Sequence, residues 1–500
     1  MGLLLCLLFS SVLACNREKG SEIPEDALFE SVEDTQSVDT FSPVPITCDE
    51  VVGTRMKLHE KARRFDELAE TLHIRAGQNL LWSVFMTEDL ASFERVDMSD
   101  NVGSWTAIYS ASQAFRYAVT KDNKALLNLK RVMKGQLDMM RITGVRGLFT
   151  RVIVDPSLEG FPSAQQLDSW YPDCDLSKRH CKRFVEVKEG EYKGKWFKTD
   201  VSKDEYPAHM FSMAVAWELV DDAEVRGMVQ EIVCAVGDHL ITNGLRIRDI
   251  DGEVTTYGKV FATALDDFPG FNAALALSWM KLAGVVCKEK YEDFYRKCLL
   301  QLDVEDPCIE GEAPRSYLEY LPLAGLDLDC KTNWNNHNML ELAYYSLIRM
   351  EQDPVLRQIY WDAYKRYVWD ADDPRPMRIQ KNTLFTFFYL ANMPEGEEFP
   401  KEEAREAICT MKRFPEEKSH HAVDTLSKYK TVCTDRSGEP MASVQDFIPI
   451  DEDSMDNYYW NRNPWKLKKE EENRRIVEFP EDYLVAYWMG RYFGFISEEM

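Results

Sequence analysis

A helical spacing of apolar residues runs through almost the whole chain, and it limits the possible folds more than any other feature. Apolar side chains recur at intervals of three and four residues, which is the pattern of a helix with one buried stripe. An all-α protein is therefore expected. The spacing predicts helices at 55–74, 104–121, 123–142, 205–221, 223–243, 270–285, 288–303, 336–350, 353–369, 381–392, 401–413 and 481–494.

The connections between these helices alternate between short and long. Several pairs are joined by only a few residues, such as Asp221-Asp222, so their helices must lie antiparallel and side by side. About six such hairpins predict an (α/α) toroid, in which inner helices surround a funnel and long loops with minor β-hairpins form its rim. An open helical array or a plain bundle is the alternative, and the lack of a clear repeat period favours the closed ring over a solenoid. The long connections fall at 144–204, 244–268, 304–335 and 414–480.

The N-terminus predicts export and a lipid anchor. Met1 to Leu13 is a short apolar run that ends in Val12-Leu13-Ala14-Cys15, which resembles a lipobox cleaved before a lipidated Cys15. We expect residues 1–14 to be a signal peptide, 15–50 a flexible acidic tether and 51–500 one toroid domain on the cell envelope. The leader lacks the Lys or Arg that a secretory signal usually carries. An ordinary cleaved signal peptide with an incidental cysteine is the alternative.

Charge restricts the partners of this chain. Its 500 residues carry a net charge of -25, and such a surface repels phosphate backbones, so nucleic acid is not an expected partner. No apolar run after Leu13 reads as a transmembrane helix, so the membrane is expected to be reached through the lipid anchor only. No Cys/His spacing indicates zinc, and the sequence predicts no metal and no cofactor.

Ten cysteines remain once Cys6 in the leader and Cys15 are set aside. Disulfides persist outside the cytosol, although their connectivity cannot be read from sequence. Cysteines that bracket loop-like stretches give three expected pairs: Cys174–Cys181, Cys308–Cys330 and Cys409–Cys433.

Polar and aromatic residues gather where several predicted helices begin. After Asp100, the residues Trp105, Tyr109 and Arg116 follow at helical steps and share one face. A face that mixes aromatic and guanidinium groups suits sugar rings, whereas the alternative is a cap followed by core aromatics. Four hundred residues later Arg491 lies on another aromatic helix.

A second cluster crowds carboxylates at the start of an apolar helix. Asp200, Asp204 and Glu205 precede His209, which shares a helical face with Glu205. Helix N-termini stabilise carboxylates, and general acids and bases need such groups in contrasting surroundings. Simple capping with salt bridges is the alternative.

Two further clusters are candidate ligand contacts. Tyr257 and Lys259 follow the Asp251-Gly252 turn, which predicts a small β-hairpin at the rim. Asn336 and His337 open another helix, where amides are costly to bury without partners; an ordinary Asn cap is the alternative.

Four segments together resemble an uncharacterised family of bacterial (α/α)-toroid lipoproteins, sometimes fused to β-propellers. The chain carries the acidic Asp-x-Ser-x-Asp-Glu-x-x-x-His stretch at Asp200 to His209, but it has Lys203 where serine is usual and Tyr257 where tryptophan is expected. The wider fold group resembles six-hairpin glycosidases, polysaccharide lyases and glycan epimerases, so the resemblance implies a fold and only a leaning in function. The segments are Trp105–Thr120, Asp200–Phe211, Asn336–Leu356 and Tyr487–Gly494.

The sequence thus predicts an exported toroid that binds a carbohydrate or another small polar ligand. If the protein is a glycoside hydrolase, Asp204 or Glu205 is the acid/base, and Asp100, Asp200 or Asp266 is its partner. If it is a lyase, His209 or Tyr257 is the base, and Lys259 or Arg116 neutralises a uronate. The other alternative is a non-catalytic binding or scaffold lipoprotein. Asp200, Asp204, Glu205 and His209 are expected to line the same pocket as Trp105, Tyr109 and the Asn336-His337 pair.

Overall fold

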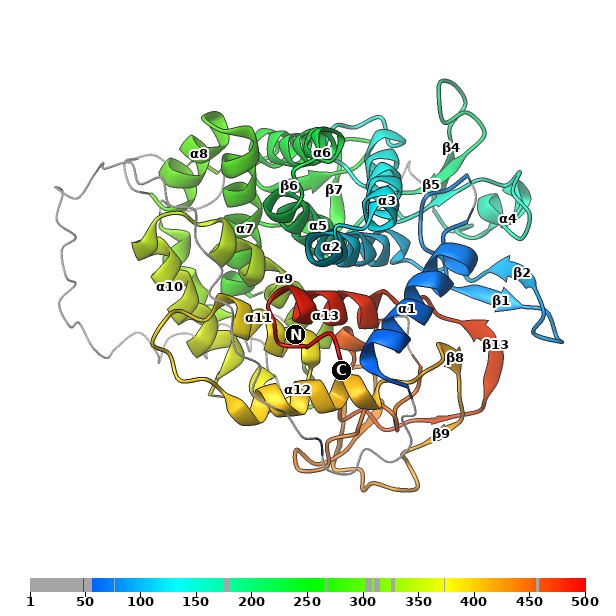
Figure 1. Ribbon diagram of the computed structural model, residues 1–500. Helices are drawn as coiled ribbons and strands as arrows, with labels where there is room; N and C mark the ends of the chain where they lie inside the picture. The colour runs from blue at the N-terminus through cyan, green and yellow to red at the C-terminus, as the bar shows by residue number, and fades with distance from the viewer. Residues whose placement is uncertain are drawn as a thin grey trace. The chain divides into compact units, whose positions relative to one another are not determined.

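Six inner helices form a closed ring in the computed structural model. The structure describes residues 48, 56–75, 77–174, 180–265, 268–301, 308–309, 315–324, 329–372, 374–455 and 458–500. Each inner helix packs on the next, and the last packs on the first (Figure 1). The inner helices are apolar on every side because they are covered on every side. In ring order they are α2 (Val102–Thr120), α5 (Tyr206–Leu219), α7 (Pro269–Cys287), α9 (Trp334–Met350), α11 (Thr383–Asn392) and α13 (Glu481–Tyr492).

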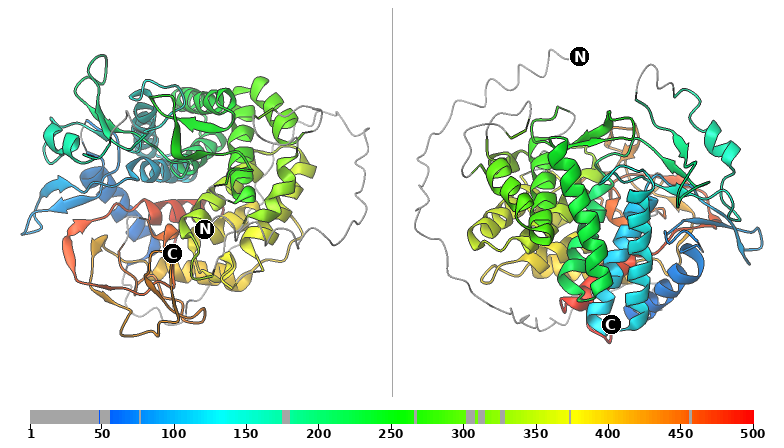
Figure 2. Two further views of the ribbon diagram at one scale, coloured as in Figure 1. Left: turned by 180° about the vertical axis from the view of Figure 1, so that it is seen from behind. Right: turned by 90° about the horizontal axis from the view of Figure 1, so that it is seen from above.

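Each inner helix has an outer partner, which makes six helical hairpins. The outer helices are amphipathic, with one face on the ring and one in water, and neighbours such as α3 and α6 lie side by side (Figure 2). Asp122, Asp222 and Asp353 end three short turns and cap the following outer helices by accepting backbone N–H groups. The outer partners, in the same order, are α3 (Asn123–Arg141), α6 (Ala223–Thr242), α8 (Lys290–Phe294), α10 (Pro354–Tyr364), α12 (Lys401–Arg413) and α1 (Leu58–Leu68).

The all-α toroid predicted from the sequence is therefore confirmed, and all twelve predicted helical ranges contain a helix. Three of them continue as π-helical turns, namely η1 (Ala69–His73), η2 (Tyr295–Leu299) and η4 (Lys365–Trp369). A short helix, α4 (Ala164–Ser169), was not predicted. All described helices belong to the unit Phe41–Met500.

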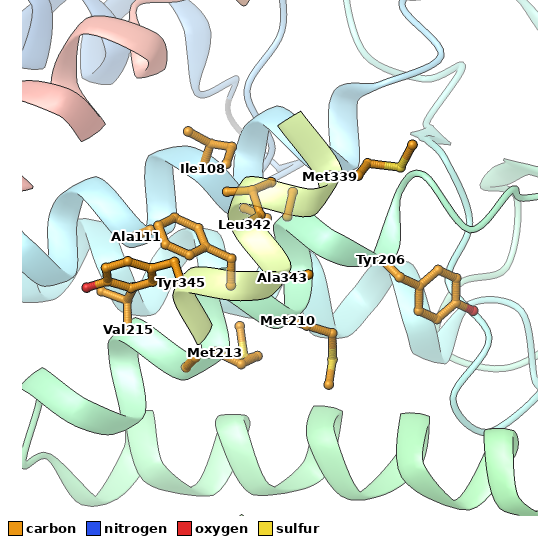
Figure 3. Close-up of a cluster of buried hydrophobic side chains, with 14 of the residues drawn as sticks. Ile108, Ala111, Tyr206, Met210, Met213, Val215, Met339, Leu342, Ala343 and Tyr345 are labelled. Carbon is orange, nitrogen blue, oxygen red and sulfur yellow. The ribbon is translucent and has the colours of Figure 1, made fainter. Parts of the chain in front are cut away.

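The expected funnel does not run open through the ring. Helix α5 packs on α9 as well as on its ring neighbours, and buried side chains of α2, α5 and α9 meet there, among them Ile108, Met213 and Leu342 (Figure 3). Large aliphatic side chains fill this space because the inner helices are apolar all round. A ligand site must therefore lie at an end of the ring.

Short strands occupy the long connections. The predicted hairpin at Asp251-Gly252 is confirmed as β6 (Arg246–Arg248) and β7 (Val254–Lys259), with Gly252 at φ +82°, a conformation that favours glycine. Two larger antiparallel sheets have the orders β3-β5-β4 and β2-β1-β13-β8. Their strands are β3 (Ile153–Val154), β4 (Phe184–Glu186), β5 (Trp196–Lys198), β1 (Val84–Met86), β2 (Phe93–Val96), β13 (Asn473–Val477) and β8 (Ser419–His420).

The remaining small elements lie mostly in the connection before α13. Two further strand pairs are β9 (Val423–Asp424) with β12 (Lys469–Glu470), and β10 (Cys433–Thr434) with β11 (Pro440–Met441). The 3-10 turns are η3 (Tyr317–Leu323), η5 (Met377–Ile379) and η6 (Tyr459–Asn461).

Five disulfides join the ten cysteines. The predicted Cys174–Cys181 bond is confirmed, but the predicted Cys308–Cys330 and Cys409–Cys433 bonds are wrong. Cys308 pairs with the nearer Cys298, and packing brings Cys330 and Cys409 to partners that are distant in sequence. Cys409 of α12, for example, reaches Cys48, 361 positions away. The other three bonds are Cys234–Cys287, Cys298–Cys308 and Cys330–Cys433.

Helix α7 corrects the expectation about apolar runs. In the part of the chain that the structure describes, it is the one helix long and apolar enough to cross a membrane by length and composition. It is 89% buried over its apolar window, because it is an inner helix of the ring. Cys15 and almost all of the expected tether lie outside the described residues.

Candidate functional site

All six inner helices begin at the same end of the ring, where the long connections reach them. We call this end of the ring the loop end. The opposite end, which carries the short turns between α2 and α3 and between α5 and α6, is called the turn end. Hydrogen bonds link neighbouring starts: Lys203 Nζ, just before α5, donates to Asn272 Oδ1 of α7 at 2.9 Å, and Ser104 Oγ of α2 donates to Glu205 Oε2 at 2.7 Å. The residues at the starts of α2 and α5 are therefore in contact.

Arg151 is the centre of the polar cluster at the loop end. Its guanidinium donates to Glu205 Oε1 at 2.8 Å, to Asp204 Oδ1 at 3.0 Å and to Ser202 Oγ at 2.9 Å. It also donates to the backbone oxygen of Asp100 at 3.3 Å. The sequence analysis did not single out Arg151, because a lone Arg in a loop carries no spacing signal.

Glu205 is the buried member of this cluster. It is 1% exposed, and its Oε2 accepts Ser104 Oγ at 2.7 Å and Ser104 N at 3.2 Å. Burial raises the pKa of Glu205 to about 7, although Arg151 opposes the rise. This carboxyl fastens the start of α5 to the first turn of α2.

Asp204 and Asp100 are the carboxylates that reach solvent. The Asp204 side chain is 30% exposed and forms an ion pair with Arg151, and it also accepts the Ser202 hydroxyl. Asp100 pairs with the buried Lys198 and, at 3.4 Å, with Lys182. Burial tends to raise the pKa of Asp100, but the bond and charge of Lys198 outweigh it and hold the pKa below its ordinary value.

Asp200 braces the β6–β7 hairpin and is turned away from Arg151's ligands. Its carboxylate accepts Thr256 N at 2.7 Å, Thr256 Oγ1 at 2.9 Å and His180 Nε2 at 3.0 Å. Its φ of +58° is unusual for a residue with a side chain. Burial favours the neutral acid, but the bonds from Thr256 and His180 outweigh burial and lower the pKa of Asp200.

The hairpin carries an exposed aromatic ring to the rim. Tyr257 of β7 is 60% exposed, and its backbone oxygen accepts Lys203 N at 3.1 Å. Lys259 O accepts the Lys203 ammonium at 2.9 Å. Tyr257 and Lys259 are thus held beside the segment that contains Asp204.

His209 lies one turn deeper than Glu205 on the same side of α5. Its ring stacks on Phe149 with centroids 4.0 Å apart, and Nδ1 is 2.9 Å from Gln136 Oε1 of α3. Burial lowers the pKa of His209 to about 3. The imidazole is fully enclosed between helices, so it does not line an open rim.

A group of buried polar atoms lies deeper at the loop end. Trp105 stacks on Tyr458 with centroids 4.4 Å apart, and Tyr458 is close enough to Glu481, at the start of α13, for their charges to interact. Trp105 Nε1, the Tyr458 hydroxyl and both Glu481 oxygens have no hydrogen-bond partner among the described residues. Burial raises the pKa of Glu481 well above its usual range.

The Asn336 and His337 pair also lies at the loop end but in its own packed cluster. Asn336 accepts the Asn333 amide at 2.9 Å, and His337 Nδ1 is 3.0 Å from Gln380 Nε2. Both side chains are buried. Trp334, which packs edge-on against His337, connects the pair to Trp465 rather than to Arg151.

Three predicted contacts lie elsewhere. Arg116 and Arg491 line a cleft at the turn end, and Tyr109 is buried close to the charges of that cleft. The expectation that Tyr109 lines one pocket with Asp204 and Glu205 is therefore wrong, because Tyr109 is fully buried beside the charges of the turn end. Arg116 lies at the opposite end of α2 from Trp105. Asp266 lies outside the described residues.

The described residues contain no group of three or more His, Cys, Asp or Glu side chains placed to hold a metal ion. No protein-family model matches the chain, and a search of curated proteins gives no match. Among solved structures, the chain is similar to a selenomethionine derivative of a GH76 alpha-mannanase from Bacteroides thetaiotaomicron, with 9% identity and a TM-score of 0.37 over 88% of this chain and 96% of that one. At this TM-score the likeness carries no inference about substrate or site residues.

Proposed function

We propose that this protein binds a carbohydrate at the loop end and cleaves it with Asp204 and Asp100. The observation that carries the proposal is a pair of solvent-reaching carboxylates at the loop end, Asp204 paired with Arg151 and Asp100 paired with Lys198. The exposed Tyr257 is held by its backbone next to the segment that contains Asp204. An aromatic face packs on the C–H face of a sugar ring, and carboxylates accept its hydroxyl groups. A deep core contact or a simple cap would expose neither group.

Each of the two carboxylates is held by a buried cation, Asp100 by Lys198 and Asp204 by Arg151. Lys198 keeps Asp100 ionised, which suits a base or nucleophile. Asp204 is the partner of Asp100, and hydrogen bonds from Arg151 and Ser202 fix the orientation of its carboxylate. The separation of two such carboxyls decides between retention and inversion of the anomeric centre.

The buried polar atoms around Trp105 extend the binding site inward. A sugar hydroxyl both donates and accepts, so it has the chemistry to pair with buried polar atoms such as Trp105 Nε1 and Tyr458 Oη. These groups replace Glu205 and His209 as deep contacts, because Glu205 is already bonded to Arg151 and Ser104. In the lyase alternative the enclosed His209 and the turn-end Arg116 are not available, which leaves Tyr257 as the base and Lys259 as the neutralising cation.

The leader sequence supports export and lipidation of Cys15, and we propose the cell envelope as the location. Cys15→Ala should block incorporation of radiolabelled fatty acid, whereas the matched Cys6→Ala change should not. Equal labelling of the Cys15→Ala and wild-type proteins would contradict the anchor.

The function is tested with a glycan array and a polysaccharide-hydrolysis screen on the full-length protein in detergent. Asp204→Asn and Asp100→Asn should each abolish hydrolysis of any glycan found, and Tyr257→Ala should weaken binding. Asp293→Asn on the exposed face of α8 is the control and should change nothing. Glycan binding without hydrolysis by the wild type would instead support the non-catalytic lipoprotein. If the wild type shows no binding and no hydrolysis, the proposal is rejected.

A further inference from the structure

A second cleft opens at the turn end, away from the proposed carbohydrate site. It has a volume of about 680 Å³, within the usual range of small-molecule sites. Side chains of α1, α2 and α13 line it, together with the turn between α2 and α3 and a residue near the C-terminus. The residues that the argument uses are Asp66, Arg116, Tyr487, Trp488 and Arg491.

The floor of the cleft is a built polar network. Asp66 accepts Gln113 Nε2 at 2.9 Å and Trp488 Nε1 at 3.1 Å, and Arg116 lies 3.2 Å from the same carboxylate. Arg116 also pairs with Asp122 at 3.1 Å. Four buried or half-buried groups are thus fixed by one another, so the floor is rigid before any ligand arrives.

Unsatisfied polar atoms adjoin this network. The Tyr109 hydroxyl is fully buried and has no hydrogen-bond partner among the described residues, and it interacts electrostatically with Asp66 and Arg116. On the α1 side, His59 Nδ1 is also buried without a partner in the described part of the chain. Buried polar atoms are costly unless a ligand or water satisfies them.

The charges around the cleft nearly balance. Four cationic residues, Arg63, Arg116, Lys124 and Arg491, face five acidic residues, Asp66, Glu67, Glu70, Asp122 and Glu498. The chain as a whole has a net charge of -25, so this balance is a local property. A strongly anionic ligand would meet five carboxylates, and a strongly cationic ligand would meet three guanidinium groups. The hydroxyl groups of a neutral ligand can donate to the carboxylates and accept from the guanidinium groups.

We propose that the cleft binds a neutral, hydroxyl-rich ligand, namely a sugar unit, independently of the loop end. Tyr487 and Trp488, which are 1% and 9% exposed, form part of the cleft wall. The guanidinium of Arg491, which donates to the Tyr487 hydroxyl at 3.1 Å, supplies donors. This assignment gives a place to Arg116 and Arg491, which the loop end does not use.

The test is a ligand-observed NMR titration of the full-length protein with methyl α-mannoside, methyl β-glucoside and methyl β-galactoside. Glucosamine and glucuronate serve as the cationic and anionic controls. Tyr257→Ala is present throughout, so that binding at the loop end is weakened and the cleft is measured. At least one methyl hexoside should bind saturably, and both charged sugars should bind at least ten-fold more weakly.

Arg491→Gln should weaken that binding at least five-fold, and Tyr487→Phe, which keeps the ring, should weaken it two- to five-fold. Asp293→Asn is the matched surface control and should leave Kd unchanged. Circular dichroism establishes whether each variant is folded. If Arg491→Gln is not folded, the result for Tyr487→Phe decides the question. Binding of no methyl hexoside, tighter binding of a charged sugar, or binding that neither variant changes would each overturn the proposal.

Discussion

Replacing Arg151 by Met should destabilise the protein strongly at pH 8 and only weakly at pH 4.5. Arg151 is buried and is the one cation that contacts Glu205 among the described residues. The Met side chain fills similar volume but leaves the Glu205 carboxylate without its opposite charge. The effect must therefore follow the ionisation of Glu205.

The size of the effect can be worked from the raised pKa. Burial moves the pKa of Glu205 from 4.5 to about 7 even with Arg151 present, and this gap is worth about 3 kcal/mol because one pKa unit is worth about 1.4 kcal/mol. Because the folded pKa is the higher one, the stabilisation is complete below 4.5 and is lost as the pH rises through about 7. Without Arg151 the folded pKa rises further, so the variant should lose about 3–5 kcal/mol at pH 8 but only about 1–2 kcal/mol at pH 4.5, from lost hydrogen bonds.

Chemical denaturation under non-reducing conditions at both pH values measures this difference. The matched control is the double variant Arg151→Met with Glu205→Gln, which removes the buried charge as well. The double variant should recover most of the stability that Arg151→Met loses at pH 8. Equal losses at the two pH values, or no recovery in the double variant, would show that Glu205 is not the charge that Arg151 neutralises.

Three further outcomes follow from the fold. Replacing Cys48 and Cys409 together by Ser should lower the free energy of unfolding by about 2–5 kcal/mol in denaturant titrations, and no loss would mean that the bond does not form. Gly270→Ala should lower the melting temperature, because a Cβ there would lie 2.5 Å from a backbone oxygen, at a cost of about 1–3 kcal/mol; the control Gly227→Ala meets no atom within 4 Å and should not lower it. Burial disfavours the charged ring of His180, but bonds to two aspartates outweigh burial and raise the pKa of His180. His180→Gln should therefore destabilise the protein below pH 6.5 and progressively less as the pH rises. An equal effect at pH 6 and pH 9 would contradict this prediction.

Helices could be predicted from the sequence because their signals are local. The apolar spacing of the 223–243 segment and the cap at Asp222 lie within a few residues of each other, and both act in the isolated chain. The alternation of short and long connections then gave the ring, since a short turn forces antiparallel neighbours. The strand pair of β1 with β13 joins residues almost 400 positions apart, and no local pattern could indicate it.

The candidate site was only partly predictable for the same reason. Glu205 and His209 do share a side of α5, but sequence spacing says nothing of the third helix that encloses His209. Glu481 at the start of α13 reads as an ordinary acidic first turn. Only the closure of the ring, which places α13 against α2, shows that this carboxyl is buried near Tyr458 and has no partner among the described residues.

The direction of the inner helices explains how the predicted contacts divide between the two ends. Because all six inner helices begin at the loop end, their positive dipole ends converge there and their negative ends converge at the turn end. Guanidinium groups such as Arg349 and Arg491, in the last turns of α9 and α13, are stabilised at the second. At the first, burial outweighs the dipole for Glu205 and Asp482 and raises the pKa of each. A residue's position within its helix, early or late, therefore assigns it to an end, and on this physical ground Asp204 and Arg491 belong to different sites.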